Sequence, residues 1–257
     1  MEQVDEARRV SFDARAELYD AARPSYPAAL ADHVMARCGR RMLEIGAGTG
    51  KATTLFARRG ASIVAIEPGA SLAAVLRRNV AGLDVTIEQT TFEAWPITRS
   101  FEVVVSAQAI HWIDPAVRYV KAAAVLAPRG MLAVIRNEQA ALEPALRVEL
   151  DAAYARWGPE ESEPPPDDPI GAAREELVGE IDASGLFGPV DVRMYPWTQA
   201  YSTARYLDLL DTYSDHATLA DELRTPLYDA IAKVIERRGG VVEIPYVSMA
   251  FVAQRTP

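Results

Sequence analysis

The sequence lacks several features that would tie a protein to a particular chemistry. It contains one cysteine, Cys38, in 257 residues, so neither an intramolecular disulfide nor a cysteine-based zinc site can form. No apolar run approaches the roughly 18 residues of a membrane-spanning helix. Basic residues adjoin only in pairs, such as Arg40-Arg41, and the net charge of −9 disfavours nucleic acid. We therefore expect no metal site, no membrane partner and no nucleic-acid partner.

The first ten residues, MEQVDEARRV, are charged and lack the apolar core of a secretory signal, which favours a cytoplasmic protein. About half of the residues are hydrophobic, as is usual for a globular chain with a substantial core. The length suits one α/β domain with an insertion. Nothing in the composition predicts the oligomeric state.

Strands and helices alternate through the first half of the chain. A short helix carrying Phe12, Arg15, Tyr19 and Arg23 is expected before two prolines. Beyond it, strands are predicted at 42–45, 62–66, 84–88, 101–106 and 131–136, with helices at 28–38, 51–59, 71–79 and 116–126. This alternation predicts a doubly wound, mostly parallel sheet that is covered on both faces.

The pattern changes after Asn137. Predicted elements are helices at 140–157, 172–185, 203–212 and 218–238, with strands at 190–199 and 241–254. The two strands are expected to form an antiparallel pair at the sheet edge, and the acidic, proline-rich segment 158–169 is expected to be a loop. We divide the chain into a core at 1–136, a helical cap insertion at 137–189, and a part at 190–257 that completes the core domain.

The most informative motif is Leu43-Glu44-Ile45-Gly46-Ala47-Gly48-Thr49-Gly50, which follows a buried strand and opens a helix. Gly46 permits a tight turn, and Gly48 allows a ligand to approach the backbone. Dinucleotide sites favour the spacing G-x-G-x-x-G, whereas this tighter spacing suits a ligand that joins a nucleoside to an amino acid. The alternative is a turn that only shapes the fold.

Three further segments follow strand ends, where open α/β sheets bind ligands. Glu67-Pro68 ends the second strand, and its carboxylate could hold both hydroxyls of a ribose or could simply be solvated. Thr91 and Phe92 would lie beside a base, although Phe92 could equally belong to the core. Gln108 and His111 follow the fourth strand, and His111 is as consistent with a structural role as with a catalytic one.

With these elements in place, the chain resembles the class I S-adenosylmethionine-dependent methyltransferases. LEIGAGTG is similar to the family's glycine signature and IEPG to its acidic ribose residue. SFEVVVSAQAIHWIDP and the lead-in YDAARPSYP resemble the small-molecule subgroup near trans-aconitate methyltransferase. The resemblance covers roughly residues 10–136 well. It implies a Rossmann-like fold, the cofactor S-adenosyl-L-methionine, and transfer of a methyl group to an oxygen, nitrogen or carboxylate of a small molecule.

The resemblance also implies roles for individual residues. Glu44 would approach the cofactor's amino group, and Arg23 could pair with its carboxylate or form an exposed salt bridge at a helix end. Gln108 would lie near the methionine or sulfonium side. The remaining residues implied for the cofactor are Tyr19, Gly46, Ala47, Gly48, Glu67, Pro68, Thr91 and Phe92. Many relatives carry aspartate at the position of Thr91, so a charged contact to the adenine amine is not expected here.

His111 is the leading candidate for a general base, which a phenol, alcohol or amine acceptor would need. A weaker signal places the acceptor beside residues scattered through the rest of the chain: Tyr26, Arg136, Trp197, Tyr213, Ser214 and His216. Two alternatives remain open. One is a catalytically silent module that binds S-adenosylmethionine, and the other is a nicotinamide-dependent oxidoreductase.

Overall fold

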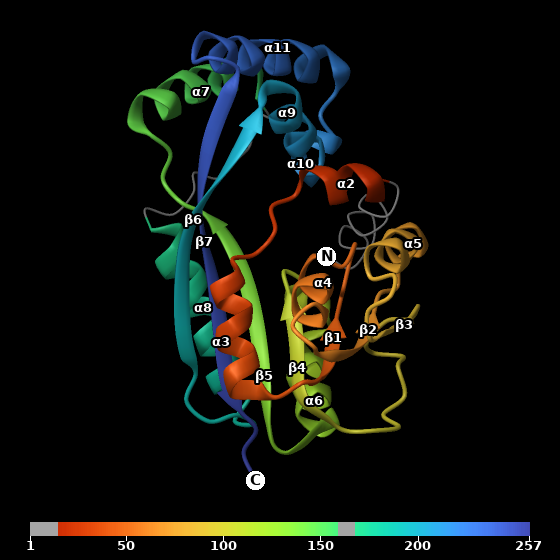
Figure 1. Ribbon diagram of the computed structural model, residues 1–257. Helices are drawn as coiled ribbons and strands as arrows, with labels where there is room; N and C mark the ends of the chain where they lie inside the picture. The colour runs from red at the N-terminus through yellow and green to blue at the C-terminus, as the bar shows by residue number, and fades with distance from the viewer. Residues whose placement is uncertain (1–14, 159–167) are drawn as a thin grey trace.

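The computed structural model describes residues 15–158 and 168–257. Within these ranges the chain forms a seven-stranded mixed sheet in the order β3-β2-β1-β4-β5-β7-β6 (Figure 1). The first five positions are parallel, and β7 is antiparallel to both of its neighbours, which confirms the predicted fold class. The strands are β1 Arg41–Ile45, β2 Ser62–Ile66, β3 Val85–Glu88, β4 Phe101–Ala107, β5 Leu126–Gln139, β6 Asp191–Ser202 and β7 Val241–Gln254.

Helices cover both faces of the sheet because alternate strand residues point to opposite sides. Met42 packs with α3 (Ala28–Cys38) and α4 (Lys51–Ala57), in a cluster that also includes Leu76 of α5 (Ala70–Asn79). Its neighbour Leu43 packs in the opposite cluster with α6 (Pro115–Val125) and α8 (Pro169–Ala183). Both faces are therefore apolar and dry, as a parallel sheet requires.

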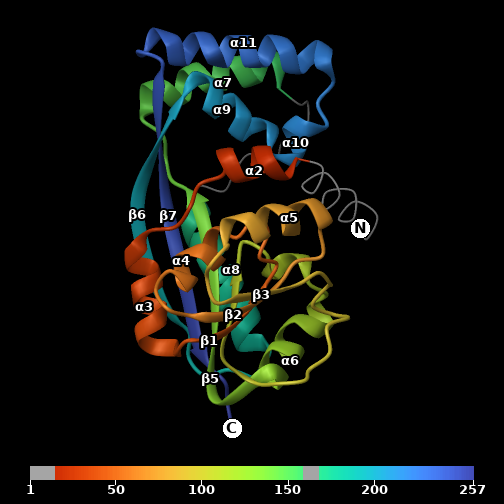
Figure 2. The same ribbon diagram turned by 45° about the vertical axis from the view of Figure 1, so that its right-hand side comes forward.

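A separate helical layer lies beyond the carboxyl ends of the parallel strands (Figures 1 and 2). It consists of α2 (Ala16–Ala22), α7 (Pro144–Trp157), α9 (Thr203–Asp211), α10 (Ser214–Ala217) and α11 (Asp221–Arg237). Its core contains Leu150, Leu209 and Ile231, each at most 3% exposed. We call this layer the cap; it is a different set of residues from the cap insertion predicted at 137–189.

The cap is carried by a two-stranded extension of the sheet. The register pairs β5 with β7 only from Tyr246 to Gln254. Residues 241–245 of β7 pair with 198–202 of β6 alone. This ribbon therefore projects past β5 and brings α9 and α11 over the strand ends, and a cavity forms between the cap and the sheet.

Several predicted boundaries were wrong in the second half. The helix expected from residue 140 begins at Pro144, because β5 continues to Gln139 beside β7 and the Glu143 carboxylate caps the helix by accepting from Ala145 and Leu146 N–H groups. The helix expected over 218–238 begins only at Asp221, after the separate turn α10. The helix expected at 172–185 begins earlier, at Pro169, where Asp168 accepts from the Gly171 N–H.

The segment 137–189 does not pack as one insertion. Its first three residues belong to β5, and α7 packs against α11 in the cap. In contrast, α8 lies against the sheet, where Leu177 and Ile181 meet Met249 of β7. Phe12 and nearly all of the proline-rich segment lie outside the described residues. Across the described ranges, no helix is both long and apolar enough to cross a membrane.

Candidate active site

A cavity of about 1130 Å³ lies between the cap and the carboxyl ends of β1, β2, β4 and β5. Nearly all the residues predicted from the sequence line it, although they come from widely separated parts of the chain. They are Tyr19, Arg23, Tyr26, Glu44, Gly46, Ala47, Gly48, Glu67, Pro68, Thr91, Phe92, Gln108, His111, Arg136, Tyr213 and His216. The cavity therefore sits where ligands bind in open α/β sheets.

The glycine turn after β1 forms the floor of this cavity. Gly46 and Ala47 donate their N–H groups to the carbonyl of Ile66 at 2.9 and 3.0 Å. Gly48 has a φ of +58°, and a Cβ added there would meet no protein atom within 4 Å. A residue with a side chain would be strained at this φ and would project into open space. The bare backbone at Gly48 is thus free to touch a ligand.

Glu67, at the end of β2, is 5% exposed, so the predicted alternative of a solvated loop carboxylate is wrong. One of its oxygens accepts from the Gly48 N–H at 2.7 Å and the other from the Gly69 N–H at 2.8 Å. The carboxylate therefore joins the two ligand-facing turns. A carboxylate can accept up to about four hydrogen bonds, so these two N–H donors do not by themselves exclude a ligand hydroxyl.

Two buried charged groups of opposite sign face this cavity with an atom unsatisfied. Glu44 is 2% exposed, and its Oε2 has no hydrogen-bond partner. Burial raises the pKa of Glu44 to about 7, while the nearby Thr53 hydroxyl lowers it and the Glu67 charge raises it by smaller amounts. Elsewhere in the lining of the cavity, the Nε of Arg23 is also buried without a hydrogen-bond partner. Unpaired buried polar atoms are costly, and they are expected where a ligand completes the site.

Arg23 is not the exposed salt bridge that the sequence allowed as an alternative. Its Nη2 donates to the Thr212 carbonyl at 2.8 Å. Its guanidinium lies over the rings of Tyr213 and Tyr19, with distances of 4.2 and 5.2 Å to their centroids. These contacts hold a cation between α2 and the segment that follows α9, and no carboxylate of the described residues pairs with it.

The loop after β4 is fixed by side-chain amides. Gln108 adopts a φ of +56° and donates from Nε2 to the Asn137 carbonyl at 2.9 Å. Asn137, which sequence reasoning missed, donates in turn to the Ser25 carbonyl at 2.9 Å and accepts from Ser248. This chain of hydrogen bonds ties the lead-in segment to β5 and β7. Nothing in the sequence around Asn137 marked it as part of a site.

The predicted base-facing pair takes largely structural positions. Phe92 is 1% exposed and packs in the sheet cluster with Trp95, with the ammonium of Lys121 over its ring at 5.3 Å. The hydroxyl of Thr91 accepts from the Ala94 N–H at 3.2 Å and so closes a turn. Both residues still contribute to the cavity wall.

His111 and Arg136 line the cavity beyond the ends of β4 and β5. Solvent reaches His111 through the cavity, but surrounding protein desolvates the ring, and the charges of Arg136 and Arg118 act in the same direction, so its pKa lies below the usual value. Arg136 is paired with Glu138 at 3.0 Å and Glu176 at 2.9 Å. Its positive charge is therefore already balanced.

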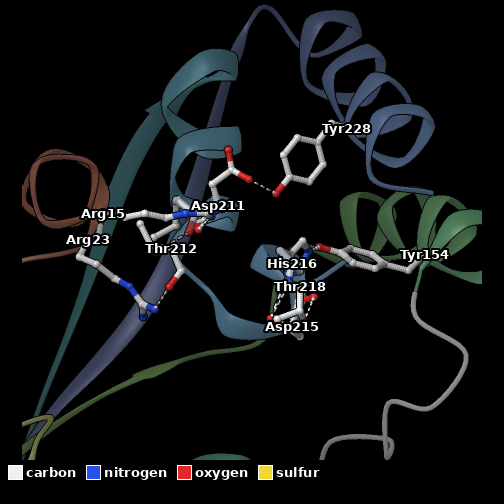
Figure 3. Close-up of polar contacts among 10 residues, drawn as sticks. Arg15, Arg23, Tyr154, Asp211, Thr212, Asp215, His216, Thr218 and Tyr228 are labelled. Atoms are coloured by element: carbon white, nitrogen blue, oxygen red, sulfur yellow. Dashed lines mark hydrogen bonds and ion pairs between the residues drawn. The ribbon is translucent and has the colours of Figure 1, made fainter. Parts of the chain in front are cut away.

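The cap side of the cavity contains groups that sequence reasoning did not single out: Tyr154, Tyr206, Asp215 and Tyr246. Of these, Tyr154 and Asp215 contact the predicted residue His216 (Figure 3). The apolar spacing of α7 would have placed Tyr154 on a buried helix face, but no local motif distinguished it from a core residue.

The two remaining residues predicted for the acceptor pocket are Trp197 and Ser214. Trp197 does not line the cavity; it donates to the Ser248 hydroxyl at 2.9 Å and stacks on Tyr246. Its place on the β6–β7 ribbon makes it a packing residue. The side chain of Ser214 lies outside the described residues.

Comparison with known proteins gives a consistent result. Residues 42–130 match a family described as a methyltransferase domain. An uncharacterized methyltransferase of Mycobacterium tuberculosis strain H37Rv is 30% identical over 247 residues, covering 93% of each chain.

Two solved structures illustrate the fold. A candidate type II methyltransferase from Anaeromyxobacter dehalogenans has a TM-score of 0.63 at 21% identity, and the match covers 91% of this chain and 96% of that one. Phosphoethanolamine N-methyltransferase 2 of Haemonchus contortus, solved in complex with S-adenosyl-L-methionine, has a TM-score of 0.52 at 14% identity. That match covers 95% of this chain and 57% of the other.

Proposed function

Because this chain belongs to the class I S-adenosylmethionine-dependent methyltransferase family, we propose that it binds S-adenosyl-L-methionine in this cavity and methylates a small molecule. The resemblance to the trans-aconitate subgroup remains part of this proposal. So do the cytoplasmic location and the absence of a nucleic-acid partner, which rest on the charge of −9 and the N-terminal composition.

The observation that carries the proposal is the pair of unsatisfied charged groups in one cavity. The amino-acid end of the cofactor presents an ammonium and a carboxylate. Glu44 Oε2 lacks a donor, and Arg23 Nε lacks an acceptor. An α-amino acid supplies both at once, whereas a nicotinamide dinucleotide supplies no ammonium for Glu44. Charge-assisted hydrogen bonds of this kind contribute about 1.5–3 kcal/mol each.

The glycine turn and Glu67 support the placement of the adenosyl part. The open space over Gly48 admits a ligand against the backbone. Glu67 is held beside it by the Gly48 N–H, and its carboxylate would accept from the two ribose hydroxyls. A 2′-phosphate would be repelled by the same carboxylate, which disfavours NADP.

When bound, the cofactor supplies a sulfonium methyl that is already activated for displacement. What the protein must then do is align an acceptor with the S–CH₃ bond and exclude water. Holding reactants in line can contribute up to ~7–11 kcal/mol. Tyr213 and Leu209 of the cap cover the strand ends. Tyr19 and Arg23, at the α2 end of the cap, close the side of the cavity. These elements would bury the reacting atoms.

Calorimetry with S-adenosylhomocysteine, compared with NADH, tests cofactor identity. We expect binding of the first and none of the second, and the reverse would indicate an oxidoreductase. A transfer assay with methyl-labelled S-adenosylmethionine and a panel of small metabolites tests turnover. Binding without any methylated product across the panel would favour the catalytically silent alternative.

A further inference from the structure

Three polar side chains on the cap side of the cavity form one hydrogen-bonded series (Figure 3). His216 lies on α10 beside Asp215, and its Nδ1 is 3.1 Å from Asp215 Oδ1. On its other side, its Nε2 is 2.9 Å from the hydroxyl of Tyr154, which comes from α7. All three residues line the cavity, opposite the glycine turn. The series thus links α7 to α10 through Tyr154 and His216, which are 62 residues apart in the sequence.

The partners determine which nitrogen carries the hydrogen. The Asp215 carboxylate also accepts from the His216 backbone N–H at 2.9 Å, and hydrogen bonds from His216 hold the pKa of Asp215 below its ordinary value. An ionised carboxylate only accepts, so Nδ1 must donate. In a neutral ring Nε2 is then the acceptor, and the Tyr154 hydroxyl donates to it. The lone pairs of the Tyr154 oxygen remain for another donor.

The surroundings hold this arrangement in place. His216 is 6% exposed, and its ring lies 6.3 Å from Tyr213 and 6.2 Å from Tyr228 of α11, measured between centroids. Burial raises the pKa of Tyr154, and the nearby phenol of Tyr206 on α9 raises it further by electrostatic repulsion. Among the described residues, the charges that act on Tyr154 are those of Asp215 and of the phenols Tyr206, Tyr213 and Tyr228. Within the same part of the chain, Asp215 is the carboxylate that pairs with His216 and would balance a protonated ring.

The charges of the cavity indicate the acceptor that this series would serve. Arg147 pairs with Asp151 at 2.7 Å, and Arg136 pairs with two glutamates. Lys51 donates to the Asp20 carbonyl at 2.7 Å and forms an ion pair with the Asp20 carboxylate at 4.0 Å. Among the described residues, this leaves Arg23 as the cavity-lining cation without a carboxylate partner, and the proposed function assigns it to the cofactor. A polycarboxylate acceptor would find no free cation, whereas an uncharged molecule would lie against tyrosine and leucine side chains.

We propose that the acceptor is an uncharged, largely apolar molecule with an O–H or N–H group, and that Tyr154 and His216 take up its proton during methyl transfer. As the acceptor heteroatom bonds to the methyl carbon, the S–CH₃ bond breaks and its electron pair stays on sulfur. The acceptor proton passes to the Tyr154 oxygen, and the Tyr154 proton passes to His216 Nε2. The resulting imidazolium is paired with Asp215. Tyr154 would contact the acceptor, and His216 and Asp215 act through it as positioning residues.

This inference rests on the proposed function, but its first test needs no cofactor. Nitrogen-15 NMR of the free protein reports the tautomer of each of the three histidines, and a His216→Asn variant identifies the signals of His216. We expect the Nδ1–H tautomer, with an Nε2 signal that shifts in Tyr154→Phe. Tyr228→Phe is the matched control, because Tyr228 flanks the ring but donates to Asp211 at 2.8 Å. An Nε2–H tautomer in the wild-type protein would overturn the proposal.

The second test uses the pH profile of transfer to hydroxyl-bearing members of the metabolite panel. Tyr154→Phe should lower kcat by about 10²- to 10⁴-fold at neutral pH and leave the affinity for S-adenosylhomocysteine within twofold. Tyr228→Phe should change neither. An unchanged kcat and pH profile in Tyr154→Phe, or transfer to tricarboxylates instead, would overturn the inference while leaving the proposed function intact. If the wild-type protein did not bind S-adenosylhomocysteine, the proposed function itself would be refuted.

Discussion

Glu44→Gln should make the cofactor-free protein more stable at pH 8 and no more stable at pH 5. Burial raises the pKa of Glu44 from an ordinary value of 4.5 to about 7, so the folded protein binds this proton more tightly than the unfolded chain does. The stability that this proton provides is present below pH 4.5 and is lost as pH rises through 7. At pH 8 the ionised group therefore costs up to about 3 kcal/mol, from 1.36 kcal/mol per pH unit. Glutamine removes that cost.

Thermal unfolding at pH 8 and pH 5 measures this difference. For a chain of this size about 2–4 °C accompanies each kcal/mol, so Tm should rise by at most roughly 6–12 °C at pH 8. Glu102→Gln is the contrasting control, because the backbone N–H groups of Arg41 and Arg40 hold the pKa of Glu102 below its ordinary value. That variant should gain no stability at pH 8. Equal Tm values for wild type and Glu44→Gln at pH 8 would refute the reasoning that Glu44 is an uncompensated buried charge.

The remaining predictions concern the ligand and the cap. Binding an ammonium beside Glu44 requires its ionised form, so the wild-type Kd for S-adenosylhomocysteine should weaken about tenfold from pH 8 to pH 6 and stay flat in Glu44→Gln, as calorimetry would detect. Gly48→Val should abolish that binding while circular dichroism stays native, because the new side chain enters open cavity space; retained binding would contradict the placement of the ligand. Glu67→Ala should weaken binding by about 1–3 kcal/mol, and an unchanged Kd would remove the ribose contact from the account. Leu209 is 1% exposed in the cap, so Leu209→Ala should lower the free energy of unfolding, measured by urea denaturation, by about 2–5 kcal/mol. A loss below about 0.5 kcal/mol would indicate that the cap is not tightly packed.

The first half of the fold followed directly from the sequence because its strands are short, apolar and separated by glycine turns. The strand predicted at 62–66 is β2 itself, and the turn after Ile45 lies where the glycines required it. The second half was harder to predict because long-range pairing overrides local pattern. β5 extends to Gln139 only because β7 pairs with it. No local pattern near Asn137 predicts its pairing with Ser248, which is 111 residues away.

The site divides in the same way. The glycine turn and Glu67 are features of one βαβ unit, and their spacing identified them, whereas the role of Glu44 came from the family resemblance. Tyr154 could not be found from spacing, because α7 meets His216 of α10 only in the folded chain. Asp215 adjoins His216 in the sequence, but no motif singled it out. The sequence also could not show that Arg136 is balanced by Glu176, since α8 and β5 approach each other only in the folded chain.

A crystal structure with S-adenosylhomocysteine bound would test most directly whether Glu44 and Arg23 together hold the amino-acid end of the cofactor. We predict the ligand ammonium at about 3 Å from Glu44 Oε2, its carboxylate against Arg23, and its ribose hydroxyls at Glu67. A ligand bound with its amino-acid end away from Glu44, or a cleft filled by the protein's own side chains, would contradict the account.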